Sequence, residues 1–179
     1  MIKKIVRMGN PLLAGQAKPV EAFSTPELYQ LIQDLFDTMK SNGGVGIAAP
    51  QIGVALQVVV FGFDHSTRYP HATSIPETVL INPRFVPVSD EHYPDWEGCL
   101  SMRGLRGLAH RFKQIHYEGY DQHGNFFERE VSGFHARVVQ HEIDHLNGKL
   151  LVNRVNDLSY FGFEDEMQTL MQQTGDKLA

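Results

Sequence analysis

Two histidines four residues apart, His141 and His145, constrain the fold of this chain more than any other sequence feature. If the segment 140–145 is helical, both side chains project from one face, and both imidazoles can reach a single metal ion while Glu142 lies beside them. A His-Glu-x-x-His helix of this kind is typical of metal-dependent hydrolases. The alternative is a solvated helix on which the two histidines form an ordinary polar pair.

The only cysteine among the 179 residues is the candidate for a third metal ligand. A catalytic metal site needs three protein ligands and one open position. Cys99 lies in the stretch EGCLS, which we expect to be a loop or an extended segment that can present the thiolate to the helix. A free cysteine is often just a small buried hydrophobe, and that alternative stays open. A lone cysteine cannot form an internal disulfide, which fits a reducing compartment.

A glycine-rich stretch, GVGIAAPQ at residues 44–51, follows the first predicted helix. Its glycines would let another backbone approach closely, and Gln51 can donate a side-chain hydrogen bond. The stretch does not fit a phosphate-binding loop, because it follows a helix instead of a strand and lacks the lysine of that motif. Ordinary turn chemistry is the alternative explanation.

Hydrophobic periodicity and turn signals predict three helices and four strands. Thr25 can cap a helix that has Pro26 at its first position and ends at Asn42-Gly43-Gly44. The other expected elements are helices over about 132–147 and 164–173, strands over 55–63, 78–82, 114–120 and 126–131, and an irregular arm over 1–23. We therefore expect an α+β fold in which residues 1–179 form a single compact catalytic domain. Its antiparallel strands would pack around a central helix carrying the His-Glu-x-x-His motif, with an N-terminal helix and a C-terminal helix.

The composition excludes several classes of protein. With 42% hydrophobic and 21% charged residues, the chain should fold. A net charge of −5 and the absence of a Lys/Arg block argue against binding to nucleic acid. The longest apolar run, residues 58–63, is far short of the ~20 residues that span a bilayer, and the N-terminus lacks a signal-peptide pattern. We therefore expect a cytoplasmic protein without a membrane partner.

The three stretches GVGIAAPQ, EGCLS and QHEIDH, in this order, resemble the three signature motifs of the peptide deformylases. Weaker similarity extends from the MGNPLL arm to about Val152. Two departures fall on the arm and on the loop beside the substrate entrance: Ala14 stands where many members have Arg, and Met102-Arg103 replaces the commoner apolar-Pro pair. Arg106 and Arg111 lie close by in sequence, where they would either position the substrate or form structural ion pairs.

The resemblance implies an enzyme that removes the N-terminal formyl group from formyl-methionine of newly synthesised polypeptides and releases formate. It implies one divalent metal ion per chain, expected to be Fe2+, although a His/His/Cys set also accepts Zn2+, Ni2+ or Co2+. The partners would be N-formylmethionyl nascent chains at the ribosome, bound by a monomer. The residues carried over from the motifs are Cys99, His141 and His145 as metal ligands, Glu142 as the catalytic acid/base, Gln51 and Leu100 as the oxyanion site, and Gly46 near the substrate backbone.

An apolar pocket should receive the methionine side chain, because a flexible thioether is recognised mainly by burial. Phe134 and Val138 precede His141 by seven and three positions on the same helix face, which makes them candidate pocket walls beside Val45. Packing in the core is the alternative for each of them. The substrate backbone would pair with the segment Gly44-Val45-Gly46 as an added strand, a mode of binding that ignores most side chains.

Two other functions compete with this interpretation. A zinc endopeptidase shares the His-Glu-x-x-His helix but takes its third ligand downstream, and after His145 the chain has no further His or Cys. Glu164, Asp165 and Glu166 could formally supply a carboxylate there, but a cysteine is the softer ligand for iron or zinc. A metal-binding protein without turnover is the non-enzyme alternative, and the presence of both Gln51 and Glu142 argues against it.

Overall fold

The computed structural model describes residues 1–67, 69 and 71–178, and this part of the chain forms three α-helices and eight β-strands. The helices are α1 (Pro26–Ser41), α2 (Gly133–Leu146) and α3 (Glu164–Leu178). The strands are β1 (Gly46–Ala48), β2 (Val58–Phe63), β3 (Ile75–Pro87), β4 (His92–Gly98), β5 (Leu105–Phe112), β6 (Gln114–Tyr120), β7 (Phe126–Ser132) and β8 (Phe161–Phe163). Within these residues no helix has the length and apolar character needed to cross a membrane.

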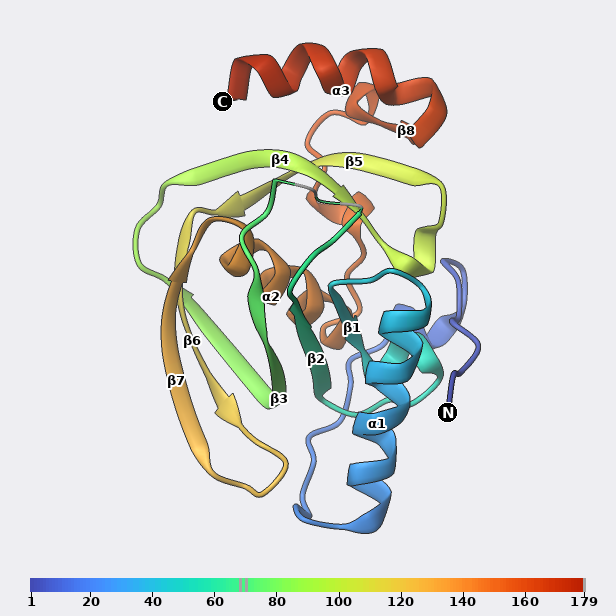
Figure 1. Cartoon of the computed structure of the whole chain (residues 1–179), viewed down its shortest axis with the longest axis vertical. Coiled ribbons are helices and arrows are strands. Elements are labelled where there is room, and N and C mark those ends of the chain that lie inside the picture. The colour runs from blue at the N-terminus through green and yellow to red at the C-terminus, as the bar shows by residue number, and fades with distance from the viewer. Residues whose placement is uncertain (68, 70, 179) are drawn as a thin grey trace.

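Helix α2 runs through the middle of the molecule, with the strands arranged around it (Figure 1). The strands form two antiparallel sheets, one with the order β1-β2-β3-β6-β7 and a smaller one with the order β4-β5-β8. Helix α1 packs on β1 and β2, whereas α3 lies outside the smaller sheet. The predicted α+β arrangement around a central motif-bearing helix is therefore confirmed.

Helix α1 forms where the sequence predicts it. The side chain of Thr25 accepts a hydrogen bond from the Leu28 N–H at 3.2 Å, Pro26 occupies the first helical position, and the helix ends at Ser41. This cap satisfies one of the N–H groups that have no partner inside the helix. The apolar face of α1 packs on the larger sheet. Leu28, Ile32, Leu35 and Met39 of the helix share a buried cluster with Ile47, Val58 and Val60 of the strands.

Helix α2 has two chemically different faces. One face packs into the main core through Ala136, Val139, Ile143 and Leu146, against Val59, Leu80, Ile115 and Tyr117 of the larger sheet. The other face turns Arg137, His141 and Asp144 toward β4 and β5 of the smaller sheet. The helix thus separates the apolar core from a layer of buried charge, and that layer holds the candidate site.

Three predicted boundaries are corrected by the structure. The strand expected over 55–63 begins only at Val58, and the strand expected over 78–82 belongs to the 13-residue β3. The third helix continues to Leu178 instead of ending near residue 173. The predicted hairpin, in contrast, is confirmed, since β6 and β7 pair in register from Gln114 opposite Ser132 to Tyr120 opposite Phe126.

Strands β4 and β5 were not predicted from the sequence, and their composition explains why. Sequence analysis finds strands by alternating apolar residues. In β4 a proline occupies position 94, and Glu97 is a buried carboxylate where an apolar side chain would be expected. In β5 the buried positions include Arg106 and Arg111. These strands bury ion pairs, and no pattern based on hydrophobicity can reveal them.

Candidate active site

The three predicted metal ligands come together where the end of β4 meets α2. Cys99 directly follows β4, while His141 and His145 project one turn apart from α2. Their ligand atoms all lie within 4.8 Å of one another, and Cys99 Sγ is 3.3 Å from His145 Nε2. A thiolate and two imidazoles at such distances can hold one Zn2+ or Fe2+ ion and leave a coordination position open. The donor set therefore fits a catalytic metal ion.

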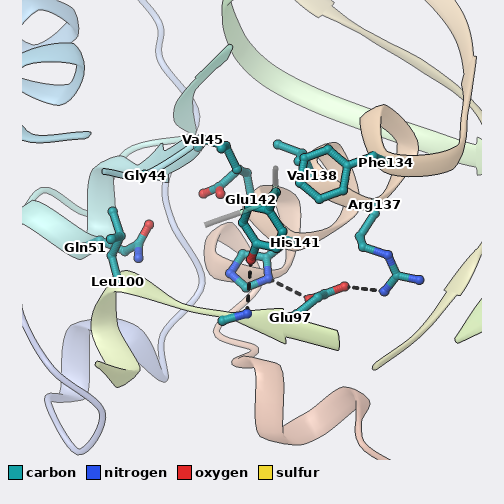
Figure 2. A pocket seen from close by; sticks show the side chains of 13 residues that line it. Gly44, Val45, Gln51, Glu97, Leu100, Phe134, Arg137, Val138, His141 and Glu142 are labelled. Carbon is teal, nitrogen blue, oxygen red and sulfur yellow. Dashed lines mark hydrogen bonds and ion pairs between the residues drawn. The ribbon is translucent and has the colours of Figure 1, made fainter. Parts of the chain in front are cut away.

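A buried carboxylate that the sequence analysis missed supports His141. Glu97 Oε2 lies 2.8 Å from His141 Nδ1, which orients the ring and leaves its Nε2 for a metal. Arg111 binds both oxygens of Glu97 at 2.9 Å. Arg137 Nη1 binds Oε1 of the same carboxylate at 2.7 Å (Figure 2). Burial raises the pKa of Glu97, but Arg111 and His141 outweigh it and hold that pKa well below its usual range. Glu97 is the first residue of the EGCLS motif, and its place two residues before Cys99 was the sequence feature that could have identified it.

The arginines singled out in the sequence form structural ion pairs. Arg111 also contacts Asp144, whose carboxylate binds Arg154 at 2.5 and 2.9 Å. Arg106 donates to Glu164, the first residue of α3, at 2.6 and 2.9 Å. Glu164 was one of the downstream carboxylates that a zinc endopeptidase would need as a ligand, and it is instead engaged by Arg106.

The two histidines strongly affect the protonation of Cys99, and Cys99 in turn affects that of His141. Burial by itself raises the pKa of the Cys99 thiol, yet the neighbouring His145 and His141 hold it well below its ordinary value. Burial lowers the pKa of His141, but Cys99 and Glu97 raise it well above its ordinary value. The surroundings therefore favour the thiolate, which is the form of cysteine that binds metals.

Glu142 lies beside these ligands in an enclosed position. Burial raises the pKa of its carboxyl to about 7, although His141 and His145 oppose the shift. Its Oε2 has no hydrogen-bond partner among the described residues. Gly46 makes room for it, since a Cβ at that position would lie 2.8 Å from Glu142 Cδ. A carboxyl group with a pKa near neutrality can both accept and donate a proton.

Gln51 and Leu100 border the same space. The Gln51 side chain is fixed at one end, where its Oε1 accepts the Ala48 N–H at 2.8 Å. Its Nε2 lies 3.1 Å from Ser101 Oγ and 3.7 Å from Cys99 Sγ. Leu100 is the first residue of a short 3-10 turn, Leu100–Met102, that directly follows the cysteine. The structure thus brings the Gln51 amide and the backbone after Cys99 to one side of the ligand group.

A cavity lined by His141 and Glu142 opens beside this group. Val45, Phe134 and Val138 all line this cavity, and Figure 2 shows Phe134 and Val138 side by side. Gly44 and Gly46 also line it, at the start of β1, which is an edge strand of the larger sheet. Tyr69, from the loop between β2 and β3, contributes a further ring that the sequence analysis did not identify. The cavity combines apolar walls with polar groups at one end.

The fold and the site together define a metal-dependent hydrolase. The sequence model of the polypeptide deformylase family matches residues 2–160. The chain is 56% identical to peptide deformylase 2 of Ralstonia nicotianae, over 92% of this chain and 93% of that protein. It is 53% identical to peptide deformylase 1 of Bordetella pertussis, over 98% of this chain and all of that protein.

Solved structures agree with the sequence comparisons. A crystal structure of class I type b peptide deformylase from Acinetobacter baumannii with Met-Ala-Ser bound has a TM-score of 0.84 at 36% identity, covering 87% of this chain and 99% of that one. Peptide deformylase from Thermotoga maritima has a TM-score of 0.77 at 32% identity, covering 88% and 99%. The chain belongs to the polypeptide deformylase family, whose members are metal-dependent enzymes that remove the N-terminal formyl group from nascent polypeptides.

Proposed function

We propose that this chain deformylates formyl-methionyl polypeptides with one Fe2+ ion held by Cys99, His141 and His145, and with Glu142 as the acid/base. One observation carries the proposal: a buried Cys/His/His group lies beside a carboxyl of raised pKa at the polar end of an apolar cavity. The donor set also accepts Zn2+, Ni2+ or Co2+. The presence of a soft thiolate supports iron or zinc over magnesium or calcium.

The chemistry divides between the ion and the side chains. A bound divalent ion of this kind acts as a Lewis acid and lowers the pKa of water from 15.7 to about 7. Glu142 would take a proton from the attacking water on its carboxylate as the new C–O bond forms at the formyl carbon. It would then deliver this proton to the amine nitrogen as the C–N bond of the formamide breaks, which releases formate and the free amine. Glu97 keeps His141 in the ring orientation that binding requires.

The oxygen of the formyl group needs donors that are already in place. We assign this role to the Leu100 backbone N–H and the Gln51 side-chain amide, which border the ligand group from one side. The loss of one such donor typically costs about 2.7–4 kcal/mol of transition-state stabilisation. The hydrogen bond from Ala48 to Gln51 Oε1 supports the assignment, because it fixes the amide before any substrate arrives.

The substrate would lie along the cavity with its first side chain against Val45, Phe134 and Val138. Its backbone would add to the edge of β1 through Gly44–Gly46, so that affinity comes mainly from main-chain hydrogen bonds. Recognition of this kind suits nascent chains of many sequences. The Met-Ala-Ser peptide bound to the Acinetobacter relative supports the assignment of a peptide that begins with methionine. We further propose that residues 1–179 act as one catalytic domain, as a cytoplasmic monomer that meets its substrates at the ribosome.

The test is anaerobic release of formate from a formyl-methionyl tripeptide by Fe2+-loaded protein, with bound metal quantified. We expect turnover by the wild type and loss of both metal and turnover in Cys99→Ala. His110→Ala is a matched control, because His110 lies on β5 outside the ligand group. Absence of formate release from folded, fully metallated wild type would refute the proposal, and cleavage of an internal peptide bond would revive the endopeptidase alternative.

A further inference from the structure

Tyr69 forms an aromatic wall of the cavity, although it comes from a loop far from the three motifs in sequence. Its ring centroid is 4.8 Å from that of Phe134, and Phe63 packs against the same Phe134 ring at 5.9 Å. Phe134 therefore contacts the ring of the last residue of β2 and a ring from the loop that follows it. Tyr69 is half-buried and lines the cavity directly.

Two groups of the smaller sheet hold Tyr69 in this position. Its hydroxyl accepts a hydrogen bond from the Gly98 N–H at 3.2 Å. The guanidinium of Arg106 lies 5.6 Å from the ring centroid, close enough for a cation–π contact, and its Nη1 is 3.5 Å from the hydroxyl. Arg106 is itself fixed by Glu164. A loop residue with these contacts has a defined place in the cavity.

The distance from the ligand group to this wall matches the length of one side chain. Phe134 precedes His141 by seven residues on α2, which corresponds to about 10 Å along the helix. From the formyl carbon to the terminal methyl of methionine there are six bonds, which span about 7–8 Å when extended. A methionine side chain whose formyl group lies at the ligand group therefore reaches Phe134 and the ring beside it.

We propose that Tyr69 is a specificity-determining residue whose ring closes the outer end of the pocket for the first side chain of the substrate. The inference rests on the proposed function, because it places the formyl group at Cys99, His141 and His145. An aromatic wall favours methionine in two ways: it removes apolar surface from water, and a thioether sulfur makes favourable contacts with aromatic rings. The ring is the active element, and the hydroxyl serves to hold it.

The experiment measures kcat/KM for a formyl-methionyl and a formyl-alanyl tripeptide that are otherwise identical. The ratio of the two values is taken on one enzyme preparation, so it does not depend on the fraction of active protein. The variants are Tyr69→Ala, which removes the ring, and Tyr69→Phe, which keeps it. Tyr29→Ala is the matched control, because Tyr29 is an exposed tyrosine of α1 that packs on His123 and does not line the cavity.

We expect the Met/Ala ratio to fall about 3- to 10-fold in Tyr69→Ala and to stay within about 2-fold of the wild type in Tyr69→Phe and Tyr29→Ala. An unchanged ratio in Tyr69→Ala would overturn the inference, as would an equal fall in Tyr69→Phe. Both results leave formate release by the wild type intact. Failure of the proposed function is distinguishable, because the wild type would then release no formate from either peptide.

Discussion

Two groups of side chains in the described part of the molecule each bring three metal-binding atoms within 4.8 Å of one another. They lie in opposite environments. The inner cluster is enclosed between α2 and the end of β4, whereas the outer cluster lies at the surface of the β6–β7 hairpin. The inner cluster consists of Cys99, His141 and His145, and the outer cluster of His116, Glu118 and Glu128.

The difference shows that proximity alone does not make a catalytic site. In the inner cluster, His141 is held by Glu97, which is itself bound by two buried arginines, and His141 also lines a cavity. In the outer cluster, His116 Nε2 lies 3.3 Å from Glu128 Oε2, and Glu128 is exposed. Exposed ion pairs contribute about 0–1 kcal/mol, whereas breaking a buried pair typically costs about 3–5 kcal/mol. Mutations at the two clusters should therefore differ sharply.

The largest contrast should appear in turnover. Glu142→Gln beside the inner cluster is expected to lower kcat by about 10²–10⁴-fold, because it removes the proton acceptor and keeps the size of the side chain. Metal content should stay at the wild-type level, since Glu142 is not a ligand. Steady-state formate release and metal analysis measure the two effects, with Glu128→Gln in the outer cluster as the control. A fall of less than 10-fold would exclude the acid/base role.

Stability should show the next largest contrast. Glu97→Gln leaves the charges of Arg111 and Arg137 buried without their carboxylate, and we expect the free energy of unfolding to fall by about 3–5 kcal/mol. Urea unfolding of the metal-free proteins measures the change without any contribution from bound metal. Glu128→Gln should change the same quantity by no more than about 0.5 kcal/mol. Equal effects at the two positions would mean that burial does not distinguish the clusters.

Filling the space that Gly46 leaves beside the inner cluster should have a smaller effect on stability. In Gly46→Ala the added methyl group meets the Glu142 carboxylate, so we expect a loss of about 1–3 kcal/mol in the free energy of unfolding together with reduced turnover. Gly15→Ala is the control, because a Cβ there meets only Pro11 O at 3.7 Å, an ordinary contact. Thermal unfolding of both variants tests the prediction. Wild-type stability and turnover in Gly46→Ala would show that the carboxylate can move aside.

The smallest effect should come from the turn of the hairpin that carries the outer cluster. The Asp121 carboxylate accepts the N–H groups of His123 and Asn125 at 2.8 and 2.9 Å and the Asn125 amide at 2.8 Å. Burial raises the pKa of Asp121, but these hydrogen bonds together outweigh it and lower the pKa below its ordinary value of 3.8. Asp121→Ala should cost about 1 kcal/mol at neutral pH.

This cost should depend on pH in a defined direction. A carboxyl whose pKa is lower in the folded than in the unfolded state stabilises the fold above the unfolded-state pKa, and the contribution is lost as pH falls through the folded-state pKa. The difference in unfolding free energy between wild type and Asp121→Ala should therefore narrow below pH 3.8. Unfolding curves across this range measure it, and a difference that widens in acid would contradict the assignment.

Sequence reasoning succeeded wherever the determinant was local. The cap at Thr25, the apolar face of α1 and the β6–β7 hairpin follow from neighbouring residues, and all three were predicted. It failed for β4 and β5, where buried carboxylates and arginines replace the apolar alternation that identifies a strand. These ion pairs join two strands and a helix that are distant in sequence. A charged residue alone therefore does not show that it lies in a buried strand.

The residues of the candidate site also differ in whether local sequence could predict them. The spacing of His141 and His145 by itself placed both imidazoles on one face, because helix geometry depends only on residues one turn apart. Glu97 lies 44 residues from the histidine it supports, and Tyr69 comes from a loop that meets α2 only after the two sheets have closed around it. The sequence thus determined which atoms can bind a metal. The tertiary structure decided which buried carboxylate contacts His141 and which ring lines the cavity, since those contacts exist only once distant segments have packed together.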